Sequence, residues 1–152
     1  LILFEQMKEA ERLIKPLIKK QANDELVSLY GQLKDPQSTK LFSFLENWFN
    51  QNPQAPLSIY LALGKLAYNE ALWGKAKHYL ELAIKSAPTA EAYFMMAKTL
   101  RELDDAQSPN EFYQRGLEFA INPDQPADTL VLEKGSDDLV SANLLPKFET
   151  NR

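Results

Sequence analysis

The chain has 152 residues, of which 45% are apolar and 25% are charged, and its formal net charge is −4. This composition is that of one ordinary globular domain with a hydrophobic core, and the presence of only five glycines favours helices over a β-fold with many tight turns. The net charge gives no electrostatic reason to expect nucleic-acid binding, and the absence of cysteine excludes disulfides, thiolate metal sites and cysteine nucleophiles. Because the first residue is Leu1 rather than Met, we expect an excised piece of a longer protein.

Residues 2–20 carry apolar side chains at helical spacing and predict one amphipathic helix. The residues concerned are Phe4, Met7, Ala10, Leu13, Ile14 and Leu17. We interpret this segment as the remnant second helix of a truncated repeat, whose first helix has been cut away. Pro16 should kink this helix or end it early.

Residues 23–53 predict a degenerate pair of helices. The first would run from Asp24 to Leu33, and Asp35-Pro36 would open the second. Pro53 would close the pair. The side chains expected to point inward from the second helix are Leu41, Leu45 and Trp48.

Residues 57–88 form the clearest unit of the chain. One stripe at spacing i, i+3, i+4, i+7 consists of Tyr60, Leu63, Gly64 and Ala67. The facing stripe of the next helix consists of Trp73, Ala76, Leu80, Ala83 and Ala87, and Pro88 ends that helix. The small residues of these stripes let two backbones approach closely. This order and spacing are typical of a tetratricopeptide repeat.

Residues 90–123 repeat the same register about 33 residues later. The positions of the first stripe are taken by Tyr93, Met96, Ala97 and Leu100, while the second helix carries Tyr113 and, in the place of Ala83, Gly116. Ser108-Pro109-Asn110-Glu111 predicts a capping box at its start. The predicted fold is therefore an all-α tetratricopeptide-repeat superhelix over residues 1–123, with about six helices in antiparallel pairs.

Residues 124–152 lack this periodicity and predict an irregular, partly extended tail. The tail contains two apolar patches, Thr129 to Leu132 and Leu139 to Leu145. One expectation is that part of it folds back onto the last repeat, near Phe112 and Phe119, or lies in a groove. The alternative is a flexible tail without a docking site.

The predicted partner-binding groove lies on the first helices of successive pairs, which line the inner surface in this repeat type. The candidate residues, which combine three cations, an amide and two aromatic rings, are Lys65, Tyr68, Asn69, Phe94, Lys98 and Arg101. Lys65 and Lys98 occupy matching positions one repeat apart. Such a surface suits a carboxylate-bearing ligand. The alternative is a solvated charged face that Glu91 and Glu102 neutralise.

No catalytic or metal-binding constellation is evident, and we predict no enzyme activity. The single histidine, His78, is expected on the outer surface, and the ordinary interpretation of Met96 and Met95 is core filling. Trp73 is expected to pack across its helix pair. The acidic pairs Asp104-Asp105 and Asp137-Asp138 are expected to be solvated.

Two motifs of the clearest repeat resemble a known family. They are Leu61-Ala62-Leu63-Gly64-Lys65-Leu66 and Leu72-Trp73-Gly74-Lys75-Ala76, supported by Leu26-Val27-x2-Tyr30-Gly31 upstream and Tyr113-x-Arg115-Gly116-Leu117 downstream. Over roughly residues 8–120 the chain resembles the C-terminal tetratricopeptide region of the HemY family. The members of this family are bacterial inner-membrane proteins associated with late heme synthesis.

The resemblance implies a scaffold that organises other proteins, among them membrane-associated enzymes of heme synthesis. It also implies membrane anchoring through segments absent from this chain. No cofactor is expected. Two alternatives stay open, namely a carrier that binds heme or porphyrin, and a general peptide-binding repeat domain unrelated to heme.

Overall fold

The computed structural model describes residues 2–35, 40–104 and 108–124. Within them lie seven α-helices and no β-strand, which confirms the all-α class with about one helix more than predicted. The helices are α1 (Ile2–Gln21), α2 (Asp24–Gly31), α3 (Leu41–Gln51), α4 (Ser58–Asn69), α5 (Trp73–Ser86), α6 (Ala90–Leu103) and α7 (Pro109–Ile121). Residues 125–152 of the predicted tail, with both of its apolar patches and the Asp137-Asp138 pair, lie outside the described residues.

Capping side chains and prolines set most helix ends. The side chain of Asn23 accepts a hydrogen bond from the Leu26 N–H at 2.8 Å, and that of Thr89 accepts one from the Ala92 N–H at 3.1 Å, so α2 and α6 begin with a satisfied donor. Helix α3 ends two residues before Pro53, and α5 ends two residues before Pro88, as expected.

Three expectations about helix starts and ends are wrong. Pro16 does not end its helix early, because α1 continues to Gln21, where the buried Ile18 anchors the last turns and offsets the hydrogen bond that proline cannot make; a kink at Pro16 stays a prediction. Asp35-Pro36 does not open α3, which begins at Leu41; there the Phe42 N–H donates to Glu70 Oε1 at 3.0 Å. Ser108 makes no capping hydrogen bond with its side chain, and α7 begins at Pro109, whose fixed φ suits a first helical position.

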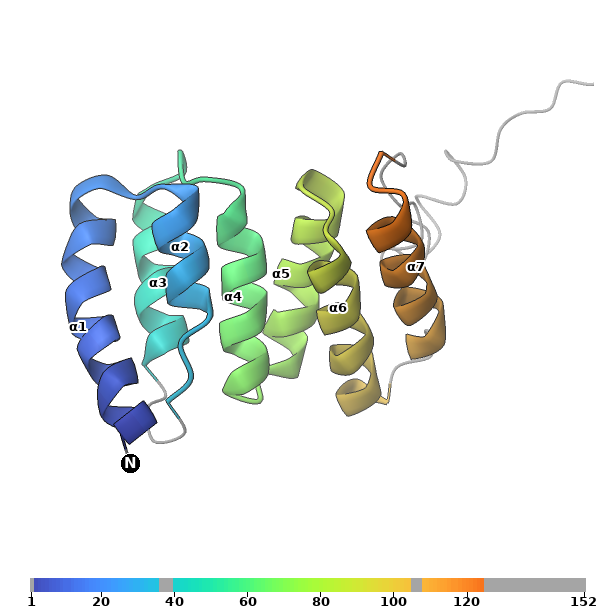
Figure 1. Ribbon diagram of the computed structural model, residues 1–152, viewed down its shortest axis with the longest axis horizontal. Coiled ribbons are helices and arrows are strands. Elements are labelled where there is room, and N and C mark those ends of the chain that lie inside the picture. Colours follow the sequence, from blue (N-terminus) through green and yellow to red (C-terminus); the bar gives the residue numbers. More distant parts are fainter. Residues whose placement is uncertain (1, 36–39, 105–107, 125–152) are drawn as a thin grey trace, which may run out of the picture.

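The helices stand in a row that runs from α1 at one end to α7 at the other, with neighbours side by side (Figure 1). The closest packing joins α4 to α5 and α6 to α7, followed by α5 to α6 and α2 to α4. The α2 and α3 backbones make few close contacts, because large side chains lie between them: the rings of Tyr30 and Phe44 have centroids 5.3 Å apart. Residues 23–53 are thus a looser unit than residues 57–88.

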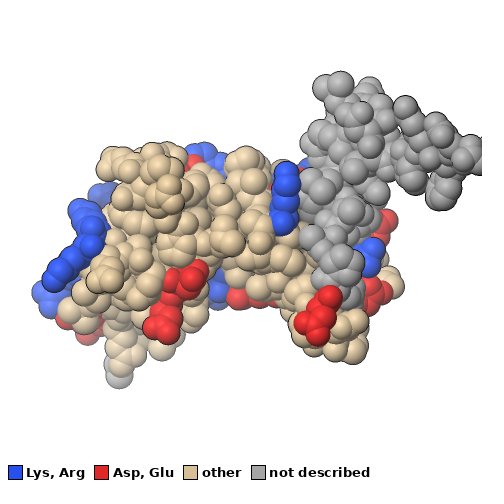
Figure 2. Space-filling view, turned by 90° about the horizontal axis from the view of Figure 1, so that it is seen from above, with Lys and Arg blue, Asp and Glu red and all other residues tan. Residues whose placement is uncertain are grey.

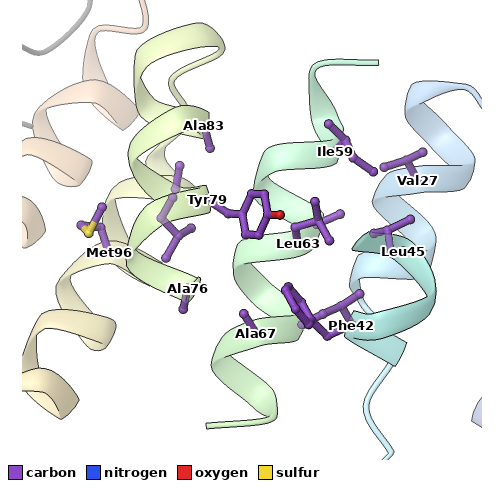
Figure 3. Packing of buried hydrophobic residues seen from close by; sticks show 14 of the residues in the cluster. Val27, Phe42, Leu45, Ile59, Leu63, Ala67, Ala76, Tyr79, Ala83 and Met96 are labelled. Carbon is purple, nitrogen blue, oxygen red and sulfur yellow. The ribbon is translucent and has the colours of Figure 1, made fainter. Parts of the chain in front are cut away.

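The core is continuous along the row. Buried side chains pass from Val27 of α2 and Leu45 of α3, through Leu63 of α4, to Ala76 of α5 and Met96 of α6 (Figure 3). Helix α4 has neighbours on several sides, so Ile59, Ala62 and Leu66 are buried in addition to its predicted stripe. The sequence pattern did not identify these three, since one stripe describes a helix with one buried face.

The predicted repeat positions fall into two groups. Those confirmed as buried are Leu63, Gly64, Ala67, Ala76, Leu80, Ala83, Tyr93, Met96, Ala97, Leu100 and Gly116. Those found half-buried are Tyr60, Trp73, Pro88 and Tyr113. At Gly64 an added Cβ would lie 2.7 Å from Leu80 Cγ, so the predicted close approach of α4 and α5 is present. A closer approach was not predicted: at Gly31 a Cβ would lie 2.8 Å from Ala62 Cα, so α2 and α4 touch through their backbones.

Candidate partner-binding pocket

One side of the row is lined by α2, α4 and α6, which present residues at matching positions. Gln32, Lys65 and Lys98 are spaced 33 residues apart and line one pocket of about 480 Å³. We call it the lysine pocket; its lining residues are Gln32, Lys34, Lys65, Tyr68, Asn69, Glu91, Met95 and Lys98. The pocket therefore gathers residues from α4, from α6 and from the segment that follows α2.

Four of the six predicted groove residues lie in this pocket, namely Lys65, Tyr68, Asn69 and Lys98. The other two, Phe94 and Arg101, are not among its lining residues, because α7 engages them. The Phe94 ring lies 6.4 Å from the Tyr113 ring and covers Gly116, where a Cβ would be 2.7 Å from Phe94 Cε1. Arg101 donates a hydrogen bond to Tyr113, which raises the pKa of Arg101.

The pocket has lining residues that the prediction left out. Gln32 could have been predicted as a pocket residue from the sequence, since it precedes Lys65 by one repeat length. No sequence pattern pointed to Lys34, because it follows the end of α2 and has no helical register. Met95 was placed beside the core and is half-buried at the pocket wall, whereas Met96 is fully buried as expected.

The charge of the pocket is positive. Three lysines against one glutamate leave two positive charges in excess among its lining residues. Lys65 Nζ lies 2.6 Å from Glu91 Oε1, and the lysine side chain is 17% exposed while the glutamate side chain is 53% exposed. The interpretation in which Glu91 neutralises this face thus holds for Lys65. The excess charge comes from Lys34 and Lys98.

Tyr68 forms an aromatic wall of the pocket. Its ring lies 5.2 Å from the Trp73 ring, so Trp73, the first residue of α5, packs across the helix pair as predicted. Lys98 Nζ lies 5.9 Å from the Tyr68 ring centroid. Partial burial, with a contribution from the charge of Glu102, raises the pKa of Tyr68, so its hydroxyl stays protonated and able to donate.

A smaller pocket adjoins the lysine pocket along α4. It measures about 50 Å³ and shares Gln32, Lys65 and Glu91 with its neighbour. At its far end lies Ser58, whose Oγ is buried and makes no hydrogen bond within the described part of the chain. The two pockets together follow α4 from Ser58 to Asn69, which at about 1.5 Å per residue is roughly 17 Å.

The remaining candidates lie elsewhere. His78 is exposed on α5, as expected, with its ring 5.2 Å from that of Tyr79. Asp104 is exposed and ends α6 with a left-handed backbone at φ 50°, while Asp105 lies outside the described residues. Within residues 2–35, 40–104 and 108–124, no group of three or more His, Asp or Glu side chains could hold a metal ion.

Comparison with known proteins identifies no relative: no family model, no curated protein and no solved structure matches the chain. The resemblance to the HemY family therefore depends on the motif residues alone. Among the helices described, none combines the length and the apolar character needed to cross a membrane.

Proposed function

We propose that this chain is a tetratricopeptide-type scaffold domain that binds partner proteins through the face formed by α2, α4 and α6. The observation that carries the proposal is the lysine pocket, in which Lys65 of α4, Lys98 of α6 and Gln32 at the end of α2, spaced 33 residues apart, meet in one positively charged concavity. We further propose, from the resemblance to the HemY family, that the partners include membrane-associated enzymes of late heme synthesis at the bacterial inner membrane.

The pocket favours a carboxylate-bearing segment of the partner. Lys34 and Lys98 supply charge in excess of Glu91, Asn69 supplies an amide, and the phenol of Tyr68 supplies a donor. Helix α4 offers roughly 17 Å of lined surface, which is the length of about five residues of extended peptide. A short acidic stretch of a partner would fit this surface without any change of the helices.

Charge reversal tests the proposal. Lys65→Glu combined with Lys98→Glu should abolish capture of partners from detergent-solubilised bacterial inner membrane, because it replaces two of the three pocket cations by anions. The matched control is Lys20→Glu with Lys85→Glu, which makes the same change of net charge at exposed positions of α1 and α5. Circular dichroism should show the same helix content for both variants. Capture of the same partners at the same salt concentration by both double variants would contradict the proposal.

Removing the charge of Glu91 should strengthen ligand binding, the opposite of the effect of the lysine substitutions. Because its carboxylate pairs with Lys65, it competes with a carboxylate of the partner for the same ammonium group. Glu91→Gln should therefore tighten the binding of a fluorescent acidic peptide by about two- to fivefold, the equivalent of one partly exposed ion pair. Fluorescence anisotropy at low and high salt measures the change. Weaker binding by this variant would show that Glu91 contacts the ligand favourably.

The carrier alternative, in which the chain binds heme, gains no specific support. His78 is not a lining residue of either pocket on this face, and the pocket residues of types that ligate heme iron are Met95 and Tyr68, without a histidine beside them. Titration with hemin separates the two functions, since a carrier gives a saturable shift of the Soret band and a scaffold does not.

A further inference from the structure

The smaller pocket along α4 contains a buried hydroxyl group. Beyond the three residues that it shares with the lysine pocket, it is lined by Ser28, Ser58, Leu61 and Ala62, and we call it the serine pocket. The Ser58 N–H donates a hydrogen bond to Asp24 Oδ1 at 3.4 Å, whereas the Ser58 Oγ makes none within the described part of the chain. A buried hydroxyl without a hydrogen bond costs free energy, and a ligand that supplies this bond offsets the cost.

The size and the charge of the serine pocket restrict which side chains fit it. Its volume of about 50 Å³ is no more than about two water molecules occupy in the liquid, so a hydroxymethyl group fits and a long side chain does not. Helices α2, α4 and α6 begin at the same end of the row (Figure 1), and Asp24, Glu25 and Glu91 lie in the first turns of α2 and α6. Figure 2 looks down on this end and shows acidic side chains along the lower edge of the view. Because these carboxylates would repel a carboxylate of the ligand, the serine pocket favours a small uncharged hydroxyl.

We propose that the serine pocket is a second subsite of the partner-binding face and takes a serine side chain two positions from the acidic residue that enters the lysine pocket. This assignment rests on the proposed function, because the lysine pocket supplies the first anchor of the bound segment. Leu61 of the serine pocket and Lys65, which lines both pockets, are four residues apart on α4, or about 6 Å along its axis. Alternate side chains of an extended peptide lie on one face about 7 Å apart, so the two pockets receive side chains two positions apart in one segment.

The ion pair of Lys65 and Glu91 couples the two pockets. Both residues line both pockets, and Lys65 Nζ lies 2.6 Å from Glu91 Oε1. The Ser58 Oγ is enclosed, so a ligand reaches it only when a lining side chain moves. A ligand carboxylate in the lysine pocket competes with Glu91 for Lys65, which frees the half-exposed glutamate side chain to turn toward solvent and widens the entrance to the serine pocket. A peptide with glutamine in place of its acidic residue should therefore show no preference for serine over alanine, and a preference that persists would overturn this coupling.

A set of fluorescent peptides tests the subsite. Each peptide carries one central glutamate with the same residue two positions away on both sides, so that the direction of binding does not matter, and anisotropy with the full chain gives its affinity. The serine peptide should bind about three- to tenfold more tightly than the alanine peptide, the equivalent of one hydrogen bond to a buried group. The leucine peptide should bind more weakly than the alanine peptide because its side chain is too large. The aspartate peptide should also bind more weakly, although it adds negative charge to a ligand of a positively charged pocket.

Ser58→Ala removes the hydroxyl from the subsite. This variant should bind the serine peptide no more tightly than the alanine peptide, while its affinity for the alanine peptide stays that of the original chain. Its melting temperature without peptide should be equal or higher, because the Ser58 Oγ makes no hydrogen bond that the substitution could remove. Ser86→Ala is the matched control. The Ser86 Oγ donates to the Leu82 carbonyl at 2.7 Å on α5, away from both pockets, so this variant loses a hydrogen bond and should keep the preference for serine.

The outcomes separate the serine subsite from the proposed function. A preference for serine that Ser58→Ala removes and that Ser86→Ala keeps supports the subsite. Equal affinities of the serine and alanine peptides for the original chain overturn it, as does a preference for serine that survives in Ser58→Ala. In both of these cases, binding that depends on the glutamate and on Lys65 and Lys98 would leave the proposed function standing. If no glutamate peptide binds, the proposed function fails, and the subsite fails with it.

Discussion

At the scale of single residues, two glycines set how closely the helices approach. A Cβ on Gly31 would meet the backbone of Ala62, with 2.7 Å to its Cβ and 2.8 Å to its Cα, whereas a Cβ on Gly64 would meet the outer atoms of the Leu80 side chain. A side chain can rotate away, but a helix backbone moves only with its whole element. Gly31 is therefore the stricter of the two positions.

Alanine substitution measures this difference. Gly31→Ala should lower the free energy of unfolding by about 2–3 kcal/mol and Gly64→Ala by about 1 kcal/mol, both within the range of overpacked cores. Gly74, near the start of α5, has nothing within 4 Å of its added Cβ and serves as the control. Gly74→Ala should be neutral or stabilise by up to about 1 kcal/mol, because alanine favours the helix. Urea unfolding of the three variants gives the values; an equal loss at all three positions would contradict the packing argument.

At the scale of helices, the sequence predicts the elements best where the 33-residue register is clear. The segments 57–88 and 90–123 each contain two helices, α4 with α5 and α6 with α7, and these are the most closely packed pairs. Prediction was weaker in residues 23–53, where Asp35-Pro36 resembled a helix start but Leu41 is the first residue of α3. The contact that fixes this start, from the Phe42 N–H to Glu70, joins residues 28 positions apart, and local patterns do not detect such pairs.

The candidate pocket illustrates the same limit. The spacing of Lys65 and Lys98 correctly places both side chains in one concavity, because equivalent positions of stacked helices lie side by side. Phe94 and Arg101 have the same kind of spacing, yet α7 engages them through Tyr113 and Gly116. Periodicity predicts which face of a helix a residue occupies. It does not predict which neighbouring helix competes for that residue.

At the scale of the whole molecule, the helices stand in a row, so each helix is stabilised mainly by the helices beside it. Each helix packs mainly on its neighbours in the row, and α1 and α7 stand at opposite ends (Figure 1). In such an arrangement the total stability is approximately a sum of the stabilities of the units and of the interfaces between adjacent units. Helix α4 packs on α2, α3, α5 and α6, so it belongs to more interfaces than either end helix.

This arrangement predicts a gradient of protection in native-state hydrogen exchange. Amides of α4 and α5 should exchange most slowly, with opening free energies near that of global unfolding. Helices α1 and α7 should open separately at lower cost, because within the described part of the chain each has neighbours on one side only. Gly31→Ala should then speed the exchange of α1 and α2, whose link to α4 it strains, and leave α7 close to its original rate. Hydrogen–deuterium exchange measured by mass spectrometry on short peptides resolves the individual helices. Equal acceleration of α1 and α7 by this one substitution would mean that the row unfolds as a single cooperative unit, and the description of its stability as a sum of neighbouring contacts would then be wrong.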